Sequence, residues 1–276
     1  MATVERLRPL PTTTISLLNA LEDPESTSSE IANLIIRDQV LTALVLQAAN
    51  AVSLGFLEPC SCISDAVTRL GFNQTKIVVM QRTFSSPLAR RLYGYRLGAG
   101  ALWEHSLATA RIAKYIAHEV NYPKSDEAYI SGLLHDIGKL VLDQYILEDY
   151  HQIVAYMQQY KISVWEAEET LLGINHAQVG GLVAVKWNLP GNLVNAIRHH
   201  HLPSLSATHQ TLGAIVNVAN AFTPPDTTSL TGLDGRTVNP VALEILHFDE
   251  LRLEKLRQRV NLKFNTPALE SSLAFS

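Results

Sequence analysis

The segment Leu133-Leu134-His135-Asp136-Ile137-Gly138-Lys139 places a histidine and an aspartate side by side within an apolar stretch. Burying both side chains is costly unless each finds a partner. A divalent cation satisfies both, because imidazole offers a neutral nitrogen and the carboxylate of Asp136 offers charge compensation and can bridge two ions. Lys139 is expected at a helix end, where its cation could meet a phosphate. The segment therefore predicts a buried metal site.

On both sides of this segment the apolar residues recur at helical spacing, and strand patterns are nearly absent. We expect an all-α fold. In the N-terminal part, helical patterns run through residues 15–21, 26–35, 41–48, 64–71 and 77–92. The remaining helices are predicted at 101–120, 126–137 (closed by Gly138), 147–160, 163–172, 175–187, 191–200, 208–222, 240–246 and 248–262.

A cluster of glycines at positions 94, 98 and 100 indicates a linker between two helical regions. We predict an N-terminal helical lobe over residues 1–95 and a second lobe with the metal pocket over 96–222. A loop and a helical extension are expected over 223–276. The part from 223 to 239 reads as a long loop, and loops of this length are uncommon unless they are functional or mobile.

The composition excludes several classes of protein. The chain has 276 residues, of which 47% are hydrophobic and 17% charged, as in a globular protein. A net charge of −4 gives no electrostatic footprint for nucleic acid. The N-terminus does not read as a signal peptide, and no apolar run approaches the roughly 20 residues of a membrane helix. Cys60 and Cys62 are too close for an ordinary disulfide, so we expect free thiols in a reducing, cytoplasmic compartment. Together with the charge and the lack of a long apolar run, this predicts a cytoplasmic protein without a membrane or nucleic-acid partner.

Further histidines occur in contexts like that of His135, on or at the end of a helix whose other face is apolar. His105 opens the helix predicted at 101–120, and His176 follows Gly173-Ile174-Asn175. Three consecutive histidines, His199 to His201, stand just before Leu202-Pro203. These side chains are expected to point inward. Four others are interpreted as ordinary core or surface residues: His118, His151, His209 and His247.

The order His105, His135-Asp136, His176 and then a histidine pair resembles the HD superfamily of metal-dependent phosphohydrolases, and its flanking residues resemble the HDOD family in particular. The stretches that carry this resemblance are Leu7–Pro11, Arg37–Thr42, Gln47–Asn50, Ala66–Gly71, Trp187–Pro190 and Ala196–Pro203. The resemblance covers roughly residues 7 to 222. It implies a multi-helical, HD-like bundle with an additional N-terminal helical lobe.

The resemblance also implies two ion sites. The first would use His105, His135, Asp136 and a late aspartate, and the second would share Asp136 and use the three remaining histidines, which are His176, His200 and His201. The late aspartate is replaced here by Asn220, whose neutral carbonyl oxygen is a weaker ligand. The expected cofactors are divalent ions such as iron, manganese or nickel.

Two functions follow from this resemblance. HDOD proteins resemble output modules of bacterial signal transduction, which would bind a signalling protein or a small phosphorylated ligand. Asn220 favours such a module, and so does Leu202-Pro203-Ser204-Leu205, where the related cyclic-dinucleotide phosphodiesterases carry Gly-Tyr-Pro. The alternative is a metal-dependent phosphohydrolase, in which a metal-activated water attacks phosphorus, Asp136 holds the ions and Lys139 offsets the developing charge. We favour the module, with the metal retained.

Overall fold

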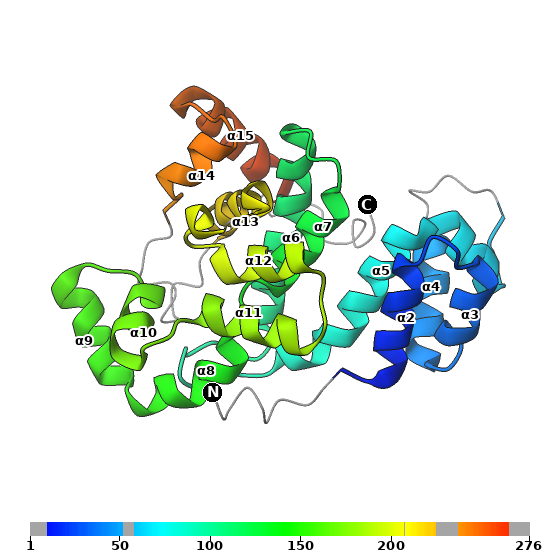
Figure 1. Ribbon diagram of the computed structural model, residues 1–276, viewed down its shortest axis with the longest axis horizontal. Coiled ribbons are helices and arrows are strands. Elements are labelled where there is room, and N and C mark those ends of the chain that lie inside the picture. The colour runs from blue at the N-terminus through cyan, green and yellow to red at the C-terminus, as the bar shows by residue number, and fades with distance from the viewer. Residues whose placement is uncertain (1–9, 52–57, 207, 225–236, 265–276) are drawn as a thin grey trace. The chain divides into compact units, whose positions relative to one another are not determined.

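The computed structural model describes residues 10–51, 58–206, 208–224 and 237–264 (Figure 1). Within these ranges the chain forms helices and no β-strand, and one isolated antiparallel bridge joins Leu92 and Leu97. The predicted all-α fold is confirmed. None of the described helices is both long and apolar enough to cross a membrane.

The described chain divides into an N-terminal unit, residues 10–86, and a C-terminal unit, residues 87–264. The N-terminal unit contains α2 (Thr12–Glu22), α3 (Ser28–Ile35), α4 (Gln39–Ala49) and most of α5 (Ile63–Ala89). A capping box starts α3: the Thr27 hydroxyl accepts from the Glu30 N–H at 3.2 Å, and the Glu30 carboxylate accepts from the Thr27 N–H at 2.8 Å. This is the helix start that residues 26–30 predict.

Two local features shape the N-terminal unit. Gly71 interrupts α5 with φ 70° and ψ 167°, values that favour glycine, so the predicted stop at this residue is a kink between two helical segments. The Asn50 amide donates to the Cys60 carbonyl at 2.9 Å and accepts from the Cys60 N–H at 2.8 Å, which joins the end of α4 to the segment before α5. Cys60 is buried and Cys62 exposed, and both are free thiols, as expected.

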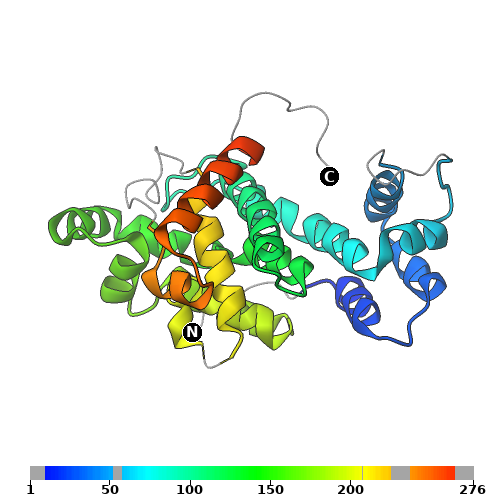
Figure 2. The ribbon, with the colours of Figure 1, turned by 90° about the horizontal axis from the view of Figure 1, so that it is seen from above.

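The C-terminal unit is a bundle whose central helices come from distant parts of the sequence. Its helices are α6 (Ala101–Glu119), α7 (Ser125–Leu134), α8 (Lys139–Glu148), α9 (Tyr150–Tyr160), α10 (Val164–Leu172), α11 (His176–Lys186), α12 (Gly191–His199), the short 3-10 helix η2 (Pro203–Leu205), α13 (Gln210–Phe222), α14 (Pro240–Ile245) and α15 (Glu250–Phe264). Helix α6 packs on α7 and α13, and α12 packs on α7, α11 and α13. Figure 2 shows α14 and α15, in orange and red, beside α13 and α6.

Most predicted helices agree with these bounds to within a few residues, but the segment around His135 differs. The helix predicted over 126–137 ends at Leu134, and tight turns lead directly into α8, which the sequence analysis missed. Lys139 therefore begins a helix instead of following a helix end, so that expectation is wrong. Gly138 has a tertiary role, because a Cβ at this position would lie 1.9 Å from the His176 carbonyl oxygen. Gly138 marks a close approach of α8 to α11.

The predicted long loop is described only at its two ends. Residues 223–224 and 237–239 are not helical, which agrees with the prediction, and residues 225–236 lie outside the described residues. The three-part organisation predicted from the sequence, with boundaries after residues 95 and 222, stays a prediction.

Candidate metal centre

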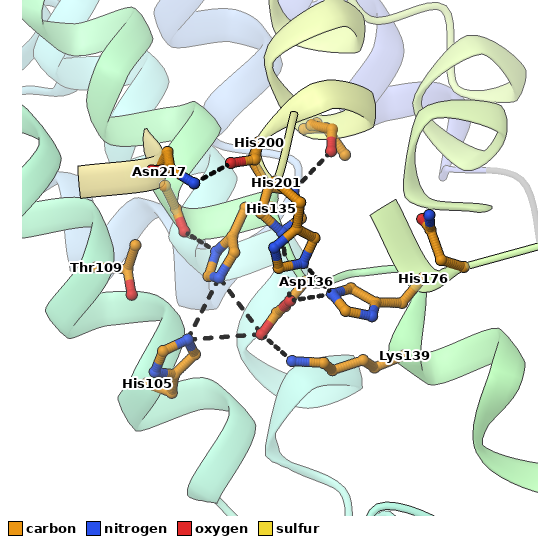
Figure 3. Close-up of polar contacts among 12 residues, drawn as sticks. His105, Thr109, His135, Asp136, Lys139, His176, His200, His201 and Asn217 are labelled. Carbon is orange, nitrogen blue, oxygen red and sulfur yellow. Dashed lines mark hydrogen bonds and ion pairs between the residues drawn. The ribbon is translucent and has the colours of Figure 1, made fainter. Parts of the chain in front are cut away.

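Five histidines and one aspartate converge in the C-terminal unit from four separate segments (Figure 3). The side chains come from the N-terminal part of α6, the turn between α7 and α8, the first residue of α11 and the end of α12. They are His105, His135, Asp136, His176, His200 and His201. Four of them are buried, whereas His105 and His201 are partly exposed. The structure thus brings together six of the seven residues predicted as ligands.

The first group consists of His105, His135 and Asp136. The two Nε2 atoms lie 3.3 Å apart, and Asp136 Oδ2 lies 3.5 Å from His105 Nε2 and 3.3 Å from His135 Nε2. Two ligand atoms about 2.1 Å from one ion and at a tetrahedral angle are about 3.4 Å apart. The triangle therefore has the dimensions of three corners of a metal site.

The second group consists of His176, His200 and His201, whose ligand nitrogens all lie within 4.8 Å of one another. The Nε2 atoms of His176 and His201 are 2.9 Å apart. Asp136 Oδ1 lies 3.2 Å from His176 Nε2 and 3.9 Å from His200 Nε2. Asp136 thus directs one carboxylate oxygen to each group, which is the arrangement of a bridging ligand.

The second group has unmet bonding capacity. Asp136 Oδ1 and His200 Nε2 are buried and have no hydrogen-bond partner within the described part of the chain, and the contact of Oδ1 with His176 Nε2 at 3.2 Å is an ion pair. Leaving a buried polar atom unpaired costs about 1–3 kcal/mol. A cation between these atoms would satisfy both, so the residues present fit a divalent metal ion.

Backbone carbonyls set the tautomer of two of the histidines. His135 Nδ1 lies 2.8 Å from the Gly132 carbonyl oxygen, and His200 Nδ1 lies 2.8 Å from that of Ile197. A carbonyl oxygen can only accept a hydrogen bond, so each Nδ1 carries the proton and each Nε2 presents its lone pair to the cluster. Both rings are therefore oriented as metal ligands.

Glu168 on α10 performs this task for His176 and was missed by the sequence analysis. It is fully buried, and its Oε2 accepts from both the Nδ1 and the backbone N–H of His176 at 2.7 Å. The Tyr95 hydroxyl donates to its other oxygen at 2.7 Å. Burial and the charge of Glu168 raise the pKa of Tyr95 well above its ordinary value. One signal was available, since Glu168 follows Val164 by four residues on the apolar face of a predicted helix.

The electrostatics of the second group favour neutral imidazoles. Burial, followed by the charges of neighbouring histidines, lowers the pKa of both His200 and His201 well below the ordinary value. Burial most strongly opposes the charged form of His176, but the charge of Glu168 together with the interactions with the Asp136 and Glu168 carboxylates raises the pKa of His176. Metal ligation requires neutral imidazoles. The imidazoles of His200 and His201 are therefore held in the neutral form that binds a metal ion.

The first group differs because a protein cation already neutralises its carboxylate. The Lys139 ammonium is buried and lies 2.5 Å from Asp136 Oδ2. Burial would raise the pKa of Asp136, but the charges of His135 and Lys139 hold it well below its ordinary value. An ion in the first group would therefore meet a carboxylate oxygen that Lys139 already binds.

Asn220, the weak seventh ligand predicted, lies on α13, and its buried Oδ1 has no hydrogen-bond partner within the described ranges. The residues three positions before and after it both face neighbours of the cluster. Asn217 donates to the His200 carbonyl oxygen at 2.8 Å, and the Thr223 and Thr109 hydroxyls lie 3.0 Å apart. Asn220 is therefore on the face of α13 that is turned to the cluster, and its role as a ligand stays a prediction.

An aromatic residue of α10 lies next to the second group, whereas four further histidines lie outside both groups. The ring of Trp165 stacks on His201 with 5.3 Å between centroids and 15° between planes, so α10 also contacts the second group. The four histidines interpreted as ordinary residues, at positions 118, 151, 209 and 247, belong to neither ligand group within the described chain.

An all-helical chain with this histidine and aspartate pocket has the architecture expected of an HD-like protein. The model of the HDOD domain family matches residues 7–203, which is most of the chain. The protein belongs to the HDOD domain family.

Solved structures share this fold. An HDOD domain protein of unknown function from Geobacter sulfurreducens is 26% identical, with 93% of each chain covered and a TM-score of 0.65. A candidate phosphohydrolase from Shewanella amazonensis SB2B is 22% identical, with 95% of this chain and 92% of that chain covered and a TM-score of 0.70.

A curated relative extends the comparison to sequence. An uncharacterized protein of Treponema pallidum is 25% identical over 272 residues, which are 98% of this chain and 50% of the relative. The chain thus spans about half the length of that curated relative.

Proposed function

We propose that this protein is a regulatory module of bacterial signal transduction whose HDOD unit binds a divalent metal ion, with iron, manganese and nickel as the candidates. One observation carries the metal proposal. Asp136 Oδ1 and His200 Nε2 are buried, lack hydrogen-bond partners in the described chain and lie 3.9 Å apart, beside the two further imidazoles of the second group. Imidazole nitrogen with a carboxylate oxygen suits these transition metals.

The second group is the tighter of the two proposed sites. It combines three histidines with an oxygen of Asp136 that has no hydrogen-bond partner among the described residues. The first group offers two histidines and the oxygen that Lys139 already binds, and Asn220 supplies no charge there. We therefore expect one ion to bind strongly at the second group and a second ion to bind much more weakly at the first.

A regulatory module is favoured over an enzyme because the pocket has asparagine where a second aspartate would add negative charge. With Asn220 in place of an aspartate, a two-ion centre has one negative charge fewer to hold both ions in place. The segment Leu202-Pro203-Ser204-Leu205 also departs from the Gly-Tyr-Pro motif of the related cyclic-dinucleotide phosphodiesterases. The proposed signal is a signalling protein or a small phosphorylated ligand, recognised through the metal-loaded pocket.

A phosphohydrolase is the second candidate, and the position of Lys139 favours it. A bound metal would supply Lewis acidity and a water of lowered pKa. Asp136 would hold the site together, and the buried Lys139 ammonium, 2.5 Å from Asp136, would place a positive charge beside the reacting phosphate. The name of the Shewanella amazonensis relative of similar fold agrees with this candidate.

Metal content separates a working pocket from a vestigial one. Tag-free protein would be analysed for metals, and Mn²⁺ binding would be measured by calorimetry for the wild type, His201→Ala, His105→Ala and the distant control His118→Ala. We expect His201→Ala to abolish the tight site, whereas His105→Ala and His118→Ala retain it. Absence of metal and of Mn²⁺ binding in the wild type would refute the metal proposal.

Catalysis is tested on the same samples. Wild type and His135→Ala would be assayed against phosphomonoesters, phosphodiesters and nucleotides with manganese, iron, nickel and magnesium in turn. A module predicts no turnover with any metal. Turnover by the wild type that His135→Ala abolishes would establish the phosphohydrolase instead.

A further inference from the structure

Two asparagines beyond the residues matched by the family model hold the backbone of the histidine pair. The Asn217 side-chain amide on α13 donates to the His200 carbonyl oxygen at 2.8 Å (Figure 3), and the Asn239 amide donates to the His201 carbonyl oxygen at 2.9 Å. The Asn239 N–H in turn donates to Asn217 Oδ1 at 2.9 Å. The two asparagines therefore form one connected network over two consecutive ligands of the second group.

Every polar atom of this network has a definite role. Asn239 Oδ1 caps α14 by accepting from the Val241 N–H at 2.9 Å, so its amide nitrogen is the atom left for His201. Asn217 is largely buried and uses both its donor and its acceptor within the network. The directions of these bonds are unambiguous, because carbonyl oxygens only accept and backbone N–H groups only donate.

Within the described residues, the backbone at the end of α12 offers no hydrogen-bond donor to the carbonyl that Asn217 holds. His200 is the C-cap of α12, where carbonyl groups lack intrahelical partners. Holding the peptide oxygens of His200 and His201 orients the peptide planes that follow these residues, which restrains ψ of both residues and φ of His201, and so the positions of the two rings. The His201 and His176 nitrogens lie 2.9 Å apart, and a small rotation of the backbone would separate them.

We propose that Asn217 and Asn239 are positioning residues of the second ion site, so that α13 and the start of α14 are working parts of the metal pocket. This inference rests on the proposed function, because it assumes that the second group binds a metal. Partners that hold metal ligands in place contribute about 10–100-fold to metal affinity. A loss of that order is expected when either amide donor is removed.

The experiment uses the full chain and Mn²⁺ alone as the probe. Asn239→Ser keeps the α14 cap, because serine is also a good N-cap, and removes the amide donor to His201. Asn217→Ser removes the donor to His200. Thr27→Ala, which breaks the capping box of α3 in the N-terminal unit, is the matched control for a general loss of stability. Binding would be measured by calorimetry and folding by circular dichroism.

We expect both serine variants to fold and to bind Mn²⁺ about 10-fold more weakly than the wild type. Thr27→Ala should melt at a lower temperature and bind Mn²⁺ as the wild type does. Unchanged Mn²⁺ affinity in both serine variants would overturn the positioning role while leaving the metal site in place. A wild type that binds no Mn²⁺ would instead refute the proposed function, and the positioning role with it.

Discussion

Gly138→Ala provides the sharpest test of how α8 and α11 assemble the pocket. Gly138 has φ −63° and ψ −23°, right-handed helical values that alanine adopts freely, so the backbone conformation itself adds no strain. The added Cβ, however, would lie 1.9 Å from the His176 carbonyl oxygen and 2.7 Å from the Gly180 nitrogen. Because both atoms belong to the backbone, no side chain can rotate away to relieve the clash.

The size of the effect follows from these distances. A carbon and a carbonyl oxygen make contact at about 3.3 Å or more, so the two backbones must separate by roughly 1.4 Å. Overpacking of this kind costs typically about 1–3 kcal/mol. A clash with rigid backbone belongs at the upper end of this range, so we expect a loss of about 3 kcal/mol, equivalent to a fall in Tm of about 6–12 °C for a unit of this size.

The same displacement acts on the metal site, since the clashing carbonyl is that of His176. We expect Gly138→Ala to weaken Mn²⁺ binding by about 10-fold or more, as when a supporting group of a ligand is lost. Thermal unfolding by circular dichroism and Mn²⁺ calorimetry would measure the two effects. Gly191→Ala is the matched control, because a Cβ at Gly191 meets no atom within 4 Å. A Gly138→Ala protein with the melting temperature of the wild type would refute the reasoning.

Two further predictions concern single side chains of the pocket. Glu168→Ala removes the hydrogen-bond acceptor of the His176 ring and should weaken Mn²⁺ binding about 10–100-fold. Glu168→Gln retains an acceptor and should keep most of the affinity in the same calorimetric titration. Equal affinities for the alanine and glutamine variants would contradict this role. Asn220→Asp restores a carboxylate to the face of α13 turned to the first group, so metal analysis should show about two ions per chain instead of one. An unchanged stoichiometry would remove Asn220 from the set of ligands.

Much of the fold follows from the local pattern of the chain. Apolar residues at a period of 3.6 define a helix without knowledge of its neighbours, and for this reason the helices predicted at 101–120 and 163–172 correspond to α6 and α10. The conformational preference of glycine is equally local: the helical pattern predicted over 64–71 ends at Gly71, and the structure has a kink in α5 at this residue. The order of the histidines, with the residues that flank them, was sufficient to indicate the HDOD family and the set of side chains that the structure gathers.

Other features depend on contacts between residues far apart in the sequence. Gly138 was read as the end of a helix, but it is required because α11 passes close to the start of α8. Glu168 reaches His176 and Tyr95, and Tyr95 lies 73 positions away along the chain. No local period encodes such a pairing.

The chemistry within the pocket was decided at this tertiary level too. The sequence by itself determined which residue types are present: neutral nitrogen donors, one shared carboxylate and an asparagine in place of a second. Only the tertiary structure decided that Lys139 occupies one oxygen of Asp136 while the other has no hydrogen-bond partner within the described ranges. It also placed Asn217 and Asn239 on the backbone of the histidine pair. The physical reason is that hydrogen bonds and metal sites depend on distances of a few ångströms between atoms, and packing sets those distances.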